Sequence, residues 1–125
     1  MREIEFRGKR KDNGDWVYGG ILQKDDYTAI VVWSDYKGWH EFIEIDPETV
    51  GQCTGLEDKN KQKTYKDDEI LLCESRIKGI VKYDNWSCQY VVVDKENRYI
   101  TDFKTIAEQQ LTFEVIGNIY EGSEG

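Results

Sequence analysis

Apolar and polar residues alternate over many short stretches of the chain, which is the pattern of strands with one buried face. Near the N-terminus, REIEFRGK places Ile4 and Phe6 on one side and Glu3, Glu5 and Arg7 on the other. The Asn-Gly pair in the following KDNGDW favours a type I′ hairpin turn, because both residues tolerate positive φ. The return strand is DWVYGGIL, whose Gly-Gly pair indicates a bulge or a close backbone approach.

The same alternation continues to the end of the chain, with turn signals between the apolar stretches. Only KTIAEQQL, residues 104–111, predicts a helix, and it is short. Strand after strand at short spacing predicts an all-β protein, as a barrel or a sandwich. The other expected strands are TAIVVWS, WHEFIEI, DEILLCES, RIKGIVKYD, SCQYVVVD, RYITDF and TFEVIGNIYEG.

Composition supports a folded chain and places it in a compartment. The 125 residues have the size of one domain, and aromatic residues make up 13% of them, which is unlike a disordered chain. No apolar run approaches the ~20 residues that span a bilayer, and the N-terminus lacks the apolar segment of a signal peptide. We therefore expect a cytoplasmic protein without a membrane segment. Cys53, Cys73 and Cys88, odd in number and widely spaced, are interpreted as free thiols.

The formal charge of −8 is unevenly distributed. Between Ile21 and Asn60 there are three lysines and nine acids. Such a chain is repelled by nucleic-acid phosphate unless a local basic face outweighs the rest, and it suits a basic protein partner. Simple solubility is the alternative explanation of the acidic charge.

Three motifs carry a family resemblance. They are FRGKRKDNGDWVYGG near the start, DPETVGQCTGLEDKN with TYKDDEI in the middle, and EVIGNIYEG at the end. In this order, over nearly the whole chain, they resemble the YopX family of small proteins encoded by phages and prophages of Gram-positive bacteria. In the family, DKN is followed by Gly and then by a short run into IYEGD. Here Lys61 stands where the first glycine is expected, and Asp68 where the Gly of EGD is expected.

The resemblance implies a two-part β fold and supplies no activity and no catalytic residue. A β-rich N-terminal portion, residues 1–52, would be followed by a small barrel of the Src homology 3-like type, residues 53–125. The turn-rich stretch between them is interpreted as a structural joint, in which aspartate caps a short helical turn that begins at the chain's only proline. Its glycines would permit backbone conformations closed to other residues. The joint residues are Asp46, Pro47, Gly51 and Gly55.

No motif in the sequence predicts catalysis, a metal site or a cofactor. His40 is the only histidine, so a catalytic triad or Cys-His pair would have to use it, and a lone histidine on a strand is usually a surface residue. Three scattered cysteines and one histidine do not form the close ligand pairs of a zinc site. Asp58 and Asn60 have the spacing of a calcium-loop start, but the later ligands are missing. Phosphate-cradling loops are absent, so an enzyme is the third choice.

Nucleic-acid binding is the second choice. Small barrels bind single strands with aromatic and basic residues on one sheet face. Arg76, Lys78 and Lys82 line one side of a predicted strand, with Trp86, Tyr90 and Tyr99 nearby in the sequence, and a second basic cluster spans residues 7–11. The acidic net charge argues against this use.

The favoured interpretation is a non-enzymatic phage or prophage accessory protein that binds a host or phage protein. Four tryptophans and eight tyrosines are more than one small core needs, so part of them should lie at an interface. Self-association is an equally good use for these residues. The candidates near predicted turns are Trp33, Tyr36, Trp39 and Trp86.

Overall fold

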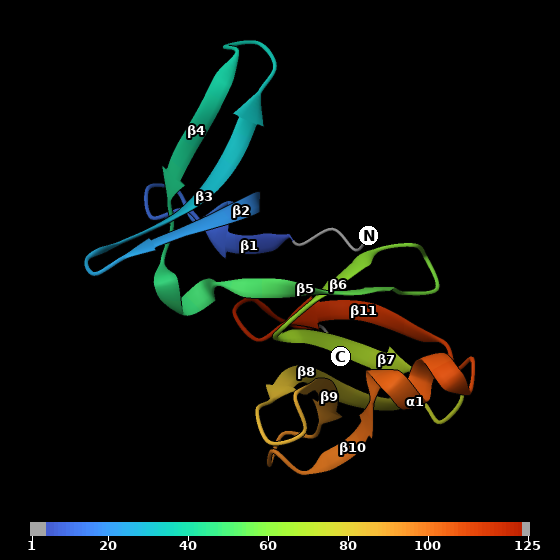
Figure 1. Cartoon of the computed structure of the whole chain (residues 1–125). Helices are drawn as coiled ribbons and strands as arrows, with labels where there is room; N and C mark the ends of the chain where they lie inside the picture. The colour runs from blue at the N-terminus through green and yellow to red at the C-terminus, as the bar shows by residue number, and fades with distance from the viewer. Residues whose placement is uncertain (1–4, 124–125) are drawn as a thin grey trace. The chain divides into compact units, whose positions relative to one another are not determined.

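The computed structural model describes residues 5–123, and within them the chain is all-β, as predicted, with a single short α-helix (Figure 1). By its internal contacts the chain divides into residues 1–53 and 54–125, called here the N-terminal unit and the C-terminal unit. Ile4 and Glu3 of the first predicted strand lie outside the described residues.

The N-terminal unit is an antiparallel meander completed by a fifth strand. Its strands pair in the order β4-β3-β2-β1-β5, so the last strand returns beside the first. Ala29, Ile30 and Ile45 are its fully buried apolar side chains. The elements are β1 (Phe6–Lys9), β2 (Trp16–Lys24), β3 (Tyr27–Ser34), β4 (Trp39–Glu44), the 3₁₀ helix η1 (Pro47–Thr49) and β5 (Gly51–Glu57).

The hairpin between β1 and β2 forms as predicted, but its turn is not of type I′. Of the Asn-Gly pair, only Gly14 has a positive φ, of 78°. The loop is also wider than two residues, since Lys9 and Trp16 are the last paired residues. The close approach predicted from the Gly-Gly pair is confirmed, because a Cβ on Gly19 would lie 2.4 Å from the carbonyl oxygen of Val31.

Arg7 was expected on a solvated face and is buried instead. Strand β1 lies between β2 and β5, so a side chain on either of its faces is flanked by neighbours. The Arg7 guanidinium carbon lies 4.6 Å from the centroid of the Trp16 ring, and the Lys9 ammonium lies 5.5 Å from it. The aromatic face thus replaces water as the partner of these cations.

The segment interpreted as a joint begins as predicted and continues differently. The Asp46 carboxylate accepts a hydrogen bond from the Glu48 N–H (3.1 Å) and caps η1. The chain then runs from one unit into the other within one strand, β5, which extends to Glu57 through the stretch interpreted as turn-rich. Gly55 has φ 91°, in the region that favours glycine. Gly51 is buried and pairs with Arg7.

The C-terminal unit is a second antiparallel sheet with the order β10-β9-β8-β7-β11-β12. The family resemblance implied a small Src homology 3-like barrel here, but in the described residues the sheet does not close, because the outer strands β10 and β12 are not paired with each other. Strand β12 has only two residues, and β10 continues directly into a helix. The elements are β6 (Lys63–Tyr65, bonded to β5), β7 (Asp68–Leu72), β8 (Ile77–Asp84), β9 (Gln89–Val93), β10 (Tyr99–Asp102), α1 (Phe103–Glu108), β11 (Phe113–Asn118) and β12 (Gly122–Ser123).

Helix α1 closes one face of this sheet. Asp102 caps it by accepting a hydrogen bond from the Thr105 N–H (2.7 Å), so it starts one residue earlier than predicted. It contributes two side chains to a core cluster of Ile70, Leu72, Val81, Val92, Phe103, Ile106 and Phe113. No helix in the described part of the chain is long and apolar enough to cross a membrane.

The two turns that depart from the family pattern both use the left-handed region. Lys61 has φ 64°, so the expected glycine conformation is kept by a lysine. In the second turn the left-handed residue is Asp67 (φ 73°), whereas Asp68, which was matched to the glycine of EGD, has no positive φ. Aspartate tolerates this region better than most residues, because its short side chain bonds locally. Asp68 is instead a buried strand residue whose carboxylate accepts from the Tyr65 N–H (2.8 Å).

Asp58, which had been considered for a calcium loop, organises the β5–β6 turn. One carboxylate oxygen accepts from the N–H groups of Asn60 and Gln62, at 2.8 Å each. The other oxygen accepts from the Val115 N–H of β11 at 2.9 Å. Burial alone would raise the pKa of Asp58, but these three backbone donors outweigh it and lower the pKa. The DKN sequence is therefore a structural turn.

Candidate interaction surface

The β3–β4 hairpin continues beyond the rest of its sheet. Strand β2 pairs with β3 only from Tyr27 to Val31, whereas the pairing of β3 with β4 runs on to Ser34 and Trp39. Beyond Val31 the two strands therefore continue without β2, whose residues 16–19 pair with β1 instead (Figure 1). Residues 31–42 are called here the β3–β4 ribbon. A two-stranded ribbon has two faces and no third strand to cover either of them.

Four large aromatic side chains on the ribbon are exposed. The exposed fractions are 56% for Trp33, 98% for Tyr36, 60% for Trp39 and 56% for Phe42. Trp33 pairs with His40, and Val31 pairs with Phe42, so Trp33, His40 and Phe42 share one face. Trp39 lies on the opposite face, and Tyr36 lies in the turn. Each face of the ribbon thus presents at least one aromatic ring.

Local bonds hold the ribbon in place without covering its rings. The Trp33 Nε1–H donates to Asp35 (2.7 Å), and the Trp33 and His40 rings meet edge to face with centroids 5.1 Å apart. Lys37 pairs with Glu41 at 2.6 Å. Gly38, with φ 74°, closes the turn by donating its N–H to the Ser34 carbonyl. The rings are therefore presented by an ordered element.

The sequence candidates are divided between the two units. Trp33, Tyr36 and Trp39 come together on the ribbon, whereas Trp86, 95% exposed, lies in the β8–β9 turn of the C-terminal unit. Phe42 was not among the residues predicted for an interface, and the contact between the His40 and Trp33 rings was not predicted. The signal was present in WHEFIEI, because His40 and Phe42 fall on the same side of an alternating strand.

Of the three residues predicted to form a basic strand face, two lie together on β8. Lys78 and Lys82 lie on the same side of β8, but Arg76 lies in the preceding turn with φ 60°. The Lys82 ammonium is 2.6 Å from the buried carboxylate of Asp67, whose second oxygen accepts from the Tyr120 hydroxyl at 2.6 Å. Lys82 is therefore largely neutralised by its own unit.

Asp67 is held in its charged form. Burial alone would raise its pKa, but the hydrogen bonds from Lys82 and Tyr120 outweigh burial, so the pKa lies below its usual value.

The basic cluster near the N-terminus is also paired with acidic side chains. Arg10 makes a two-bond pair with Asp12, and Lys11 pairs with Glu44 at 3.2 Å. These contacts reduce the positive charge that either cluster offers to phosphate.

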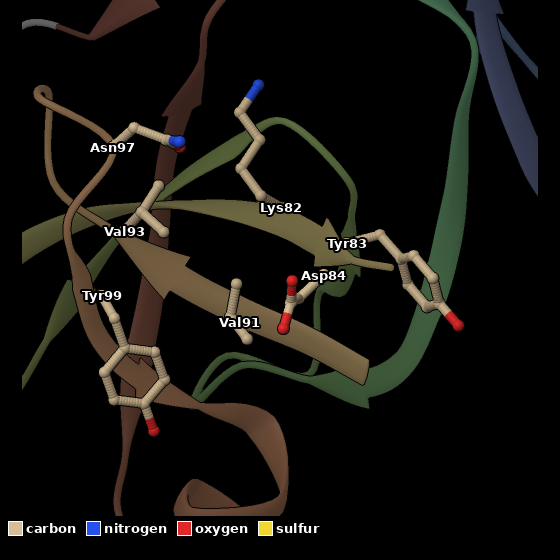
Figure 2. Close-up of a pocket in the computed structure, with 7 residues that line it drawn as sticks. All are labelled: Lys82, Tyr83, Asp84, Val91, Val93, Asn97 and Tyr99. Atoms are coloured by element: carbon tan, nitrogen blue, oxygen red, sulfur yellow. The ribbon is translucent and has the colours of Figure 1, made fainter. Parts of the chain in front are cut away.

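A shallow pocket of about 250 Å³ lies on the outer face of the C-terminal sheet. In Figure 2, Lys82 and Asn97 stand on one side, Tyr99 on the other, and Val91 and Val93 between them. Its carboxylate, Asp84, accepts hydrogen bonds from Ser87. The lining contains neither His40 nor a cysteine. It consists of Lys82, Tyr83, Asp84, Val91, Val93, Asn97 and Tyr99.

The remaining reactive residues are scattered. Cys53, Cys73 and Cys88 are free thiols, and Cys88 is exposed rather than packed as a small apolar residue. Within residues 5–123, no three His, Cys, Asp or Glu side chains are grouped so that they could hold a metal ion. His40 lies on the exposed ribbon, where its ring contacts the Trp33 ring.

Comparison with known proteins identifies the family. No curated protein matches the chain. The family model described as YopX protein matches residues 5–124, which is nearly the whole sequence. The chain therefore belongs to the YopX family.

Proposed function

We propose that this protein is a non-enzymatic phage or prophage accessory protein. It binds a host or phage protein in the bacterial cytoplasm, and the β3–β4 ribbon is its binding element. The observation that carries the proposal is the group of four exposed aromatic rings on one ordered two-stranded ribbon.

Exposed aromatic rings of this kind favour binding because of the apolar area that a partner would cover. Aromatic side chains bury a large apolar area and lose few rotatable bonds on binding, so they dominate the energetics of interfaces. Single exposed apolar residues scattered over a surface need no explanation. Here Trp33, Tyr36 and Trp39 lie at the end of one hairpin, and Phe42 lies three residues further along β4. The internal neutralisation of Lys82, Arg10 and Lys11 supports a protein partner over nucleic acid.

Affinity capture from lysate of the bacterial host tests this proposal. The full chain and a Trp33→Ala/Phe42→Ala variant serve as baits, each with and without nuclease treatment, and the retained proteins are identified by mass spectrometry. We expect one protein to be retained by the full chain after nuclease treatment and to fall at least about tenfold with the variant, as loss of a binding hot spot predicts.

Trp86→Ala is the control, because it removes a tryptophan of the other unit that is more exposed than Trp33, at 95% against 56%. It should capture the partner as well as the unaltered chain does. Equal capture by the ribbon variant would reject the ribbon as the binding element. Loss of the retained proteins on nuclease treatment would favour nucleic-acid binding instead.

A further inference from the structure

Strand β4 has an open edge. It is the first strand of its sheet, so one of its sides has no neighbouring strand. The end nearest the body of the unit is covered, because the Lys11 N–H donates to the Glu44 carbonyl at 3.2 Å and Arg10 bridges to Ile45. From Trp39 to Ile43 no strand in the described chain pairs with this side. Such an edge is a template for pairing with another chain.

Two hydrogen bonds show which backbone groups of β4 point toward its open edge. The Ile45 N–H donates toward β3, to Thr28, whereas the Glu44 carbonyl accepts from Lys11 on the other side of the strand. Backbone groups along a strand point alternately to its two sides. His40 and Phe42 therefore turn their N–H and C=O groups toward the open edge, as Glu44 does. These four groups could bond one more strand.

We propose that a basic, extended segment of a protein partner binds here by adding a strand to the edge of β4. This inference rests on the proposed function and specifies how the ribbon would bind. Main-chain hydrogen bonds would align the segment, and its side chains would lie alternately on the two faces of the ribbon. Phe42 and Trp39 are exposed on opposite faces, so each row of incoming side chains meets an aromatic ring.

Local charge and the exposed rings both favour a basic segment. Residues 31–46 contain four acids and one lysine, and acids remain in excess when Lys11, which pairs with Glu44, is added. Lysine and arginine side chains are attracted to this charge, and they also stack favourably on exposed tryptophan and phenylalanine. A second copy of this chain would bring the same acidic residues to the edge, which disfavours pairing between copies.

The test uses two end-blocked, dye-labelled peptides of about eight residues, one alternating lysine and valine and one alternating glutamate and valine. Fluorescence anisotropy at low salt measures their binding to the full chain. We expect the lysine peptide to bind and to weaken as salt is raised, and the glutamate peptide not to bind. Absence of lysine-peptide binding at about 1 mM protein, the limit of weak association, overturns the proposal.

Two variants at one position locate the binding. His40→Pro removes an N–H that faces the open edge, a place where proline is tolerated in strands. His40→Ala removes the same ring and keeps the N–H. We expect His40→Pro to weaken peptide binding at least about tenfold and His40→Ala less than about threefold, since only the first blocks strand addition. The thermal midpoint of each variant verifies that the unit is folded.

The outcomes separate this inference from the proposed function. Equal peptide binding by both variants overturns strand addition at β4. If Trp33→Ala/Phe42→Ala loses partner capture while His40→Pro retains it, the ribbon binds its partner through its faces and the edge inference is wrong. A doubling of mass by light scattering that His40→Pro abolishes would assign the edge to a second copy and also overturn the basic partner.

Discussion

The C-terminal unit packs Phe103 and Phe113 together, with ring centroids 5.7 Å apart, whereas the N-terminal unit leaves Trp33 and Phe42 exposed on the β3–β4 ribbon. Both sets of rings come from strands and a short helix with ordinary apolar patterning. The difference is that α1 covers one face of the second sheet, whereas from residue 5 onward no strand or helix of the N-terminal unit covers the ribbon. Stability should therefore depend on the aromatic residues of one unit, and binding on those of the other.

The largest expected effect comes from removing a core ring. Phe113→Ala should lower the free energy of unfolding of the C-terminal unit by about 3–5 kcal/mol, because a large cavity opens in its core. Urea denaturation followed by circular dichroism measures the change. Phe42→Ala, the same chemical change on the ribbon, is the control and should cost less than about 1 kcal/mol. Similar losses in the two variants would contradict the comparison between the units.

Asp67→Asn should have the next largest effect, about 1–3 kcal/mol at neutral pH, because it weakens charged hydrogen bonds to Lys82 and Tyr120. Asparagine tolerates the left-handed backbone of this position, so the substitution isolates the charge. The lowered pKa means that the carboxylate stabilises the fold above its unfolded pKa of about 4. This contribution is lost as pH falls through the folded pKa.

Urea denaturation of the unaltered chain and of Asp67→Asn over a range of pH measures this dependence. The difference in stability between the two proteins should shrink as the solution becomes acidic. A constant difference at every pH would show that the charge of Asp67 does not stabilise the C-terminal unit.

Lys61→Gly should stabilise the C-terminal unit by about 1 kcal/mol, because lysine at φ 64° carries a steric cost that glycine lacks. Lys59→Gly, two residues earlier and without a positive φ, is the control and should be neutral or destabilising. Thermal denaturation compares the two variants. A lower melting temperature for Lys61→Gly would mean that the turn gains more from its lysine side chain than from backbone relief.

Tyr36→Ala should have the smallest effect on stability, within about 0.5 kcal/mol, because its side chain is almost fully exposed in a turn. The same variant should reduce partner capture if the tip of the ribbon takes part in binding. Thermal denaturation and capture by mass spectrometry give the two values. A large loss of stability would place Tyr36 among the structural residues.

The strands and the short helix could be predicted because alternation and capping residues are local signals. Asp46 before Pro47 predicted a helical turn, and a 3₁₀ helix is found there. The burial of Arg7 could not be predicted, since it depends on β5 pairing with β1 from more than forty residues away. The left-handed backbone of Asp67 was not predicted, because the family's glycine was matched to Asp68, one residue further along the chain.

The candidate surface was predicted in part for the same reason. Trp33 and Trp39 were recognised from their nearness to a turn, but their faces follow from the pairing register of β3 with β4. Phe42 was missed because alternation does not tell which face of a strand will be covered. Lys82 was a candidate for the alternative nucleic-acid face, and only the fold places it beside Asp67. The local sequence pattern thus does not show which distant strands pair, and that pairing decides which side chains are covered.

The position of β11 has a consequence for synthesis of the protein on the ribosome. Residues 113–118 form a strand inserted between β7 and β12, and their backbone also donates to Asp58 of the early turn. A nascent chain that has not yet reached residue 118 leaves one edge of β7 open and its apolar core unsealed. Such a chain is exposed to aggregation and proteases. The N-terminal unit needs no residue beyond β5, so it can complete its pairing while the remainder is still being translated.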